Sequence, residues 1–196
     1  MEITNIAPIK NRAEWRGWLA RNGKTEKFCW VPVSKGMWGS ATKANHGSEL
    51  TYLDAVEEAL CFGWIDSTGK QGYQRFSPRT KKSNWTELNK ARVERLERLE
   101  LMTDEGRKVV PTIPFEVNSD IMGAIKDCKE THKNFLAFPD VYRRVRIDNI
   151  QTYKDEGCGT YEKRLQKFLE NTKANKMFGL WHDDGRLLEN NKGGKE

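Results

Sequence analysis

Charged and hydrogen-bonding side chains gather between residues 66 and 89, where they alternate with aromatic and turn-forming residues. The residues that could bind a ligand there are Asp66, Arg75, Arg79, Ser83, Trp85 and Asn89. An arginine can bind a phosphate or a carboxylate through two parallel hydrogen bonds. The free backbone N–H groups at the start of a helix also favour an anion. Because a helix is predicted to begin near Ser83, this pattern predicts a site for a small anionic ligand.

Each of these residues also has a structural interpretation. Asp66 could act as a general base or anchor a ligand, but an Asp followed by Ser, Thr and Gly also suits a turn. Arg79 could instead pair with Asp66, and Ser83 could only cap its helix. Trp85 could stack on a ligand or pack in the core, and Asn89 could reach the polar cluster or stay exposed. The sequence leaves both interpretations open.

Other motifs indicate no particular catalytic chemistry. Cys61 has no histidine at a spacing typical of an activated nucleophile, so a buried thiol is favoured. None of the three histidines, His46, His132 and His182, pairs with a carboxylate at a spacing typical of metal ligands, so no metal site is predicted. P-loop, dinucleotide-binding, α/β-hydrolase and zincin motifs do not occur, so no cofactor is predicted either. Whether the protein is an enzyme stays open.

The charge balance offers two alternative functions. The 196 residues carry a net charge of +6 and a pI near 9.1, which favours acidic partners. Basic residues in the last predicted helices could bind nucleic acid, although acidic residues interleave with them. These basic residues are Arg143, Arg144, Arg146, Lys163, Arg164, Lys167, Lys173 and Lys176. Alternatively, the protein could be a protein–protein adaptor that binds its partner through the aromatic loop at Met37-Trp38.

Composition and patterning predict a cytoplasmic protein without membrane insertion. The first residues, MEITNIAPIKNRAEW, contain no apolar stretch typical of a secretory signal. No run approaches the roughly 18 apolar residues of a membrane helix. The four cysteines are widely scattered at Cys29, Cys61, Cys128 and Cys158, which fits a reducing compartment.

The elements that would position the 66–89 residues form an α+β fold. An amphipathic helix is predicted over 9–22 and a strand over 27–33, ending at a proline. Thr51 and Asp54 have capping-box spacing before a second helix. Two strands, 62–65 and 73–76, are predicted to form a hairpin, which would complete a small three-stranded antiparallel sheet packed with helices. A helix then runs from Ser83 to about residue 101, and Thr103 caps a short one.

The second half is predicted to be all-helical. Pro111 and Pro114 mark a linker between an α+β segment, 1–110, and a helical segment, 111–181, which we expect to pack on the first as one unit. Helices are predicted after Ser119 or Asp120, up to Pro139, from Asp140 and from Thr160. The polar tail 182–196 is predicted to be disordered.

The central segment resembles the YdeI/OmpD-associated family, also called the bacteriocin-protection family. The matching residues are Tyr52, Ala55 to Glu58, ALCFGWIDS at 59–67, RFSPR at 75–79, SNW at 83–85, Asn89 and LMT at 101–103. A weaker downstream pattern comprises Pro114, Ile121–Ile125, Phe135, Tyr142-Arg143-Arg144, and Thr160 with Arg164.

The resemblance has two departures. Glu100 stands where the family usually has Gly, which bears on how the helix before it ends. Tyr161 replaces the first Arg of the family's Thr-Arg-x-x-Arg pattern, which weakens any anion site that relies on that pair. The resemblance implies a stress or bacteriocin-protection role and no defined chemistry.

Overall fold

The computed structural model describes residues 2–34, 46–154, 156–157 and 159–188. The chain forms two compact units. The first unit contains Met1–Asn84 and Val93–Pro111, and the second contains Trp85–Arg92 and Thr112–Glu196. The chain thus passes from one unit to the other after Asn84, after Arg92 and after Pro111, so the residues from Trp85 to Arg92 belong to the second unit.

The sheet of the first unit has the predicted three antiparallel strands, in the order β1-β3-β2. The strands are β1 (Cys29–Pro32), β2 (Trp64–Lys70) and β3 (Tyr73–Pro78). The hairpin strands are longer than predicted, because the chain reverses at Gln71 and Gly72 alone. Both residues have positive φ angles, +50° and +81°, as a two-residue hairpin turn requires. The predicted α+β class is confirmed.

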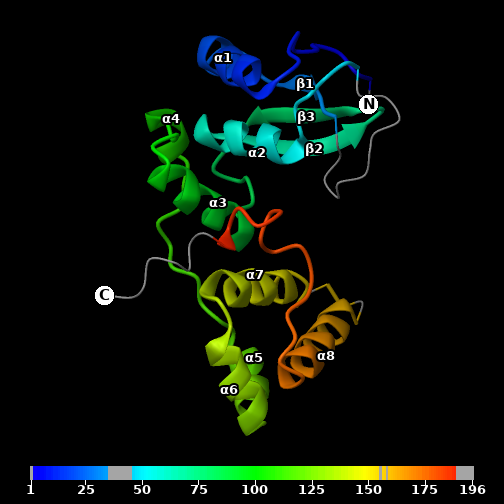
Figure 1. Ribbon diagram of the computed structural model, residues 1–196, viewed down its shortest axis with the longest axis vertical. Coiled ribbons are helices and arrows are strands. Elements are labelled where there is room, and N and C mark those ends of the chain that lie inside the picture. Colours follow the sequence, from blue (N-terminus) through cyan, green and yellow to red (C-terminus); the bar gives the residue numbers. More distant parts are fainter. Residues whose placement is uncertain (1, 35–45, 155, 158, 189–196) are drawn as a thin grey trace. The chain divides into compact units, whose positions relative to one another are not determined.

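Two helices cover one face of this sheet (Figure 1). Helix α2 (Tyr52–Cys61) packs against β2 and against helix α1 (Arg12–Asn22). The Trp15 ring of α1 lies 5.4 Å from the Phe76 ring, and Trp18 meets Trp64 edge-on at 5.8 Å. These large apolar surfaces form the core of the first unit.

The two predicted threonine caps are confirmed. Thr51 Oγ1 accepts from the backbone N–H of Asp54 at 3.1 Å, and donates to the Asp54 carboxylate. Thr103 Oγ1 accepts from Gly106 N at 3.2 Å, so it caps helix α4 (Asp104–Arg107). Gly106 must be a glycine, because a Cβ atom there would lie 2.2 Å from the Cys61 carbonyl oxygen.

Helix α3 (Glu87–Arg98) begins later than the sequence predicted. Its cap is Thr86, whose Oγ1 accepts from Asn89 N at 3.2 Å, so Ser83 lies outside the helix. Beyond the helix end, Glu100 takes a left-handed φ of +56°. A glycine adopts this conformation without steric cost, so the Gly that the resemblance implies at this position would suit the backbone.

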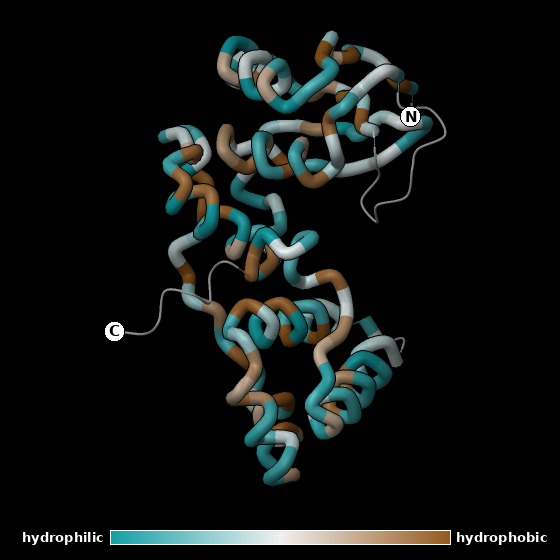
Figure 2. Tube along the Cα trace, in the orientation of Figure 1, coloured by the Kyte–Doolittle hydropathy of each residue, from teal (hydrophilic) through white to brown (hydrophobic). Residues whose placement is uncertain are grey.

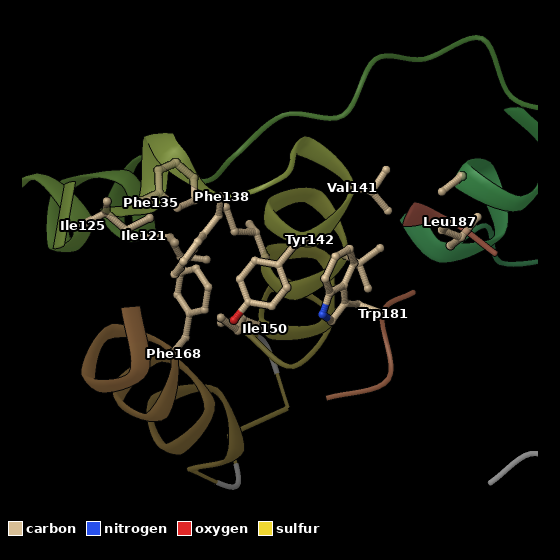
Figure 3. Packing of buried hydrophobic residues seen from close by; sticks show 13 residues of the cluster. Ile121, Ile125, Phe135, Phe138, Val141, Tyr142, Ile150, Phe168, Trp181 and Leu187 are labelled. Carbon is tan, nitrogen blue, oxygen red and sulfur yellow. The ribbon is translucent and has the colours of Figure 1, made fainter. Parts of the chain in front are cut away.

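The second unit is helical, as predicted, and its core is continuous (Figure 3). Its helices are α5 (Ser119–Lys126), α6 (Lys129–Ala137), α7 (Asp140–Gln151) and α8 (Thr160–Lys173). The Tyr142 ring of α7 lies at the centre of this core, where it contacts Phe138, Phe168 and Trp181. Figure 2 shows α8 as mostly hydrophilic along its length.

Residues 182–188, which we expected to belong to a disordered tail, form hydrogen-bonded turns. Leu187 is buried in the core of the second unit, and Asp183 pairs with Arg92. These two contacts hold residues 182–188 in place. The polar composition of the tail did not indicate them. The proposed adaptor loop at Met37-Trp38 lies outside the described residues.

Candidate functional site

Asp66 lies on the helix-covered face of the sheet. It is directly opposite Phe76 in the β2–β3 pair, and opposed residues of an antiparallel pair share a face. Tyr52, the first residue of α2, donates a hydrogen bond from Oη to Asp66 Oδ2 at 2.7 Å. The predicted carboxylate is therefore half-buried between the sheet and a helix.

Arg79 follows β3 and is only 7% exposed. Its backbone N–H donates to the Gly63 carbonyl at 2.8 Å, and its Nη1 donates to the Asn84 carbonyl at 2.8 Å. Burial lowers the pKa of Arg79 to about 10, although the charge of Asp66 acts in the opposite direction. Asp66 thus influences Arg79 through its charge, and the Arg79 guanidinium also holds the 79–84 loop together.

Arg75 points away from Asp66. It neighbours Phe76 in β3 and opposes Trp30 of β1, so its side chain leaves the sheet on the other face. There its guanidinium lies 4.6 Å from the centre of the Phe28 ring and reaches Ser67 Oγ at 3.5 Å. Arg75 and Asp66 therefore cannot line one site, because the sheet separates them.

Ser83 stabilises a turn rather than a helix start. Its Oγ accepts from Thr80 N at 2.9 Å, and its own N–H donates to the Thr80 carbonyl at 3.0 Å. Lys81 and Lys82 are exposed in this turn, which precedes the first residue of α3, Glu87.

The N-terminus of α3 already holds an anion, which is the protein's own Asp148. Asp148 Oδ2, from α7, accepts from Glu87 N at 3.0 Å. Burial and the neighbouring Glu87 charge raise the pKa of Asp148, while the hydrogen bond from Glu87 N opposes the rise. An external anion predicted for this helix start would have to displace that carboxylate.

Trp85 and Asn89 belong to the second unit. Trp85 is half-buried. Asn89 Oδ1 accepts from Arg92 Nη1 at 2.8 Å, and Arg92 binds Asp183 through Nε and Nη2 at 2.6 and 2.9 Å. Asn89 therefore serves a buried ion pair within its own unit.

The first unit contains a buried ionic network that the sequence analysis missed. Glu57 and Glu58, on α2, are only 1% and 2% exposed. Their cationic partners come from α1 and α3: Arg12 contacts both, Arg16 contacts Glu58, and Arg95 contacts Glu57, all at 2.6–3.1 Å. The available signal was an adjacent Glu pair inside an otherwise apolar helix, together with two arginines four residues apart on one helix face.

Cys61, at the end of α2, is a buried thiol. Burial raises its pKa to about 11, although Arg16 acts in the opposite direction. The thiol is therefore protonated at neutral pH, which agrees with the interpretation of Cys61 as a packing residue.

Three cations of the second unit lie over two aromatic rings. The Arg146 guanidinium, on α7, lies 4.2 Å from the centre of the Phe178 ring, and Lys167 Nζ, on α8, lies 5.2 Å from the same ring centre. Arg164, also on α8, donates to the Asn149 carbonyl and to Asn149 Oδ1, and it stacks on Tyr153 at 3.8 Å. We call Arg146, Arg164 and Lys167 the α7–α8 cation cluster.

No described carboxylate forms an ion pair with any member of this cluster. Burial lowers the pKa of Arg146, and the Arg164 charge lowers it further, while Tyr142 opposes the shift. The Arg146 Nε atom is buried and has no hydrogen-bond partner within the described part of the chain. Gly179 makes room for this guanidinium, since a Cβ atom there would lie 2.8 Å from Arg146 Nη1.

Comparison with family models assigns each half of the chain. Residues 7–109 match a domain of unknown function (DUF8412), and residues 114–175 match the family described as bacteriocin-protection, YdeI or OmpD-associated. Residues 114–175 therefore form a YdeI/OmpD-associated domain. The chain belongs to the DUF8412 family, whose match covers more than half of its length. Comparison with curated proteins and with solved structures gives no match.

The family predicted from the sequence is thus confirmed, but the match lies in a different half of the chain. The YdeI/OmpD-associated match covers the downstream pattern with Tyr142-Arg143-Arg144 and Arg164, whereas the conspicuous 52–89 segment lies entirely inside the DUF8412 match. All members of the α7–α8 cation cluster lie within the YdeI/OmpD-associated match.

The described residues give no sign of a membrane span or a metal site. None of their helices combines the length and the apolar character needed to cross a bilayer. They contain no group of three or more His, Cys, Asp or Glu side chains arranged to hold a metal ion.

Proposed function

We propose that this YdeI/OmpD-associated protein binds a small anionic ligand, carrying a phosphate or carboxylate group, at the α7–α8 cation cluster. The observation that carries the proposal is that Arg146 and Lys167 lie over Phe178, and Arg164 over Tyr153, without an ion pair to any carboxylate among the described residues. By contrast, the buried Arg92 of the same unit meets an acidic partner, Asp183.

The energetics favour an incoming anion. A buried donor without an acceptor costs about 1–3 kcal/mol, and the Arg146 Nε–H is such a donor. Burial and the like charge of Arg164 both lower the pKa of Arg146, so its charged form is disfavoured in the free protein. An anion bound there would satisfy the donor and offset the repulsion. Arginine is well suited to this because its planar group matches phosphate and carboxylate.

Nucleic-acid binding through the same helices is the alternative. It would require a continuous basic surface, and several of the basic residues named for it are already neutralised. Arg144 pairs with Glu87 and Asp140, and Arg143 contacts Asp140 as well. This pairing leaves a compact cluster, which suits one small anion better than a long polyanion.

The biological role that we propose is protection in the cytoplasm against stress or bacteriocins. The family description supports the protective role. The widely spaced cysteines, which suit a reducing compartment, support the location.

Isothermal titration with inorganic phosphate, at constant ionic strength, tests the proposed function. We expect saturable binding that Arg146→Gln or Arg164→Gln weakens by about tenfold or more, because each removes a charge-assisted hydrogen bond. Lys163→Gln is the matched control, since Lys163 is an exposed residue of α8 outside the cluster. Equal weakening by all three variants would reveal a general charge effect and contradict the site.

The same titration with a single-stranded oligonucleotide tests the alternative. Nucleic-acid binding predicts oligonucleotide affinity that falls steeply with salt, together with no binding of phosphate. The proposed function predicts the opposite pattern.

A further inference from the structure

The segment that follows α8 presents apolar side chains to solvent beside the α7–α8 cation cluster. Met177 is 41% exposed and Leu180 is 52% exposed. Single exposed apolar side chains are ordinary on a protein surface. These two, however, flank Phe178, whose ring centre lies 4.2 Å from the guanidinium carbon of Arg146. Apolar surface and cationic groups therefore adjoin each other here.

This segment, residues 177–180, is held at both ends. At one end, the Lys176 N–H donates to the Asn171 carbonyl of α8 at 2.8 Å. At the other end, Trp181 is only 4% exposed, and its ring meets the Tyr142 ring edge-on at 5.3 Å (Figure 3). The exposed apolar side chains are therefore part of the folded second unit and do not belong to a loose chain end.

The backbone of the same segment lies directly against the cations. Gly179 has a φ of +81°, and a Cβ atom there would lie 2.8 Å from Arg146 Nη1. Lys167 Nζ lies 5.2 Å from the centre of the Phe178 ring. Two cations of the cluster therefore contact the four residues that carry the exposed apolar side chains.

We propose that the anion bound at the α7–α8 cation cluster carries an apolar chain, as an alkyl phosphate does. This inference rests on the function proposed above. The anionic head group would accept hydrogen bonds from Arg146 and Lys167, and the chain would cover Met177 and Leu180. An anion without such a chain would leave this apolar surface in water, so it would gain nothing from the hydrophobic effect.

Isothermal titration with hexyl phosphate and methyl phosphate tests the inference, because the two ligands share a head group and differ only in the chain. We expect hexyl phosphate to bind about tenfold more tightly, which corresponds to the burial of about two methylene groups. Arg146→Gln should weaken both ligands by a similar factor. The double variant Met177→Gln/Leu180→Asn should remove most of the advantage of hexyl phosphate over methyl phosphate.

Leu136→Asn is the matched control, because Leu136 is 57% exposed on α6, outside residues 177–180. An equal loss of the advantage in this variant would reveal non-specific apolar contacts and overturn the proposal. Methyl phosphate that binds as tightly as hexyl phosphate would also overturn it, while the proposed function would stand. If neither ligand binds, the proposed function fails and this inference fails with it.

A membrane surface is the other partner that combines anionic groups with apolar chains. Co-sedimentation with vesicles of an anionic phospholipid distinguishes it from a free ligand. We expect the protein to stay in the supernatant and to bind hexyl phosphate. Sedimentation with the vesicles, without binding of hexyl phosphate, would overturn the proposal in favour of a membrane surface.

Discussion

Arginines in the two units have contrasting surroundings. In the first unit, Arg12, Arg16 and Arg95 meet the buried carboxylates of Glu57 and Glu58. In the second, Arg146 and Arg164 meet aromatic rings and an asparagine. Matched charges join elements of a fold, whereas cations gathered without carboxylates oppose folding and are compensated when an anion binds. The contrast suggests that the first network maintains structure and the second cluster serves binding.

The start of helix α3 shows how a predicted ligand position can be filled by the protein itself. Its N-terminal backbone N–H group is bound by Asp148 of the same unit. A helix N-terminus is therefore not a binding site merely because it favours anions; its occupancy has to be checked first.

The largest expected loss of stability comes from Glu58→Ala, which breaks the buried ionic network of the first unit. Removing one partner of a fully buried ion pair costs about 3–5 kcal/mol. Here Arg12 and Arg16 keep about a third of their side-chain surface exposed, so we expect a loss of about 2 kcal/mol. Urea unfolding measures the change. Glu97→Ala, which breaks the exposed pair with Arg107, is the control and should cost less. Equal losses would remove the distinction between buried and exposed pairs.

A smaller loss is expected from Asp148→Ala. This variant removes the acceptor of Glu87 N, so α3 loses the equivalent of a helix cap, about 1 kcal/mol. Thermal unfolding in a chloride buffer measures this loss of stability. Added phosphate should restore part of the stability by binding the exposed N–H group. A variant as stable as the wild type would show that Asp148 does not stabilise this helix start.

Removing a cation from the α7–α8 cation cluster should change the stability of the protein in the opposite direction. Arg146→Met replaces a half-buried, repelled guanidinium with an apolar side chain of similar length. We expect unfolding free energy to stay the same or rise by about 0.5 kcal/mol. Arg16→Met, in the matched network, should lower it instead. Chemical denaturation of both variants tests the contrast, and a loss of stability in Arg146→Met comparable to that in Arg16→Met would break it.

The smallest effect concerns an exposed contact of the second unit and appears only in acid. The Tyr161 hydroxyl and Lys154 hold the pKa of Asp120 at about 2, below its ordinary value. A depressed acid pKa contributes stability above the ordinary value, and this contribution is lost as the pH falls towards about 2. The difference in melting temperature between wild type and Asp120→Asn should therefore be present at pH 6 and vanish near pH 2. A constant difference would show that the charge of Asp120 is not involved.

Local signals in the sequence predicted the elements better than the site. Thr51 and Thr103 were recognisable as caps because their hydrogen bonds reach only three residues along the chain. The start of α3 was misplaced because Ser83, a good capping residue, is engaged with Thr80 instead. No local pattern could show that choice.

Features that depend on distant residues escaped prediction. The α3 N-terminus is filled by a carboxylate 61 positions away, and Glu57 and Glu58 are buried because arginines from two other helices reach them. Arg75 was separated from Asp66 only by the strand register. The basic residues of α7 and α8 were visible as a set, but which of them lack acidic partners is decided by packing.

The central claim is that the α7–α8 cation cluster binds an anion, and the Arg146 Nε–H reports on it most directly. Its signal in a ¹H–¹⁵N NMR spectrum can be assigned through its loss in Arg146→Lys. We predict that phosphate shifts this signal downfield in the wild type and in Lys163→Gln, because the buried donor gains a charged acceptor, and that the shift disappears in Arg164→Gln. A signal that stays in place throughout the phosphate titration, or that shifts equally in Arg164→Gln, would contradict the claim.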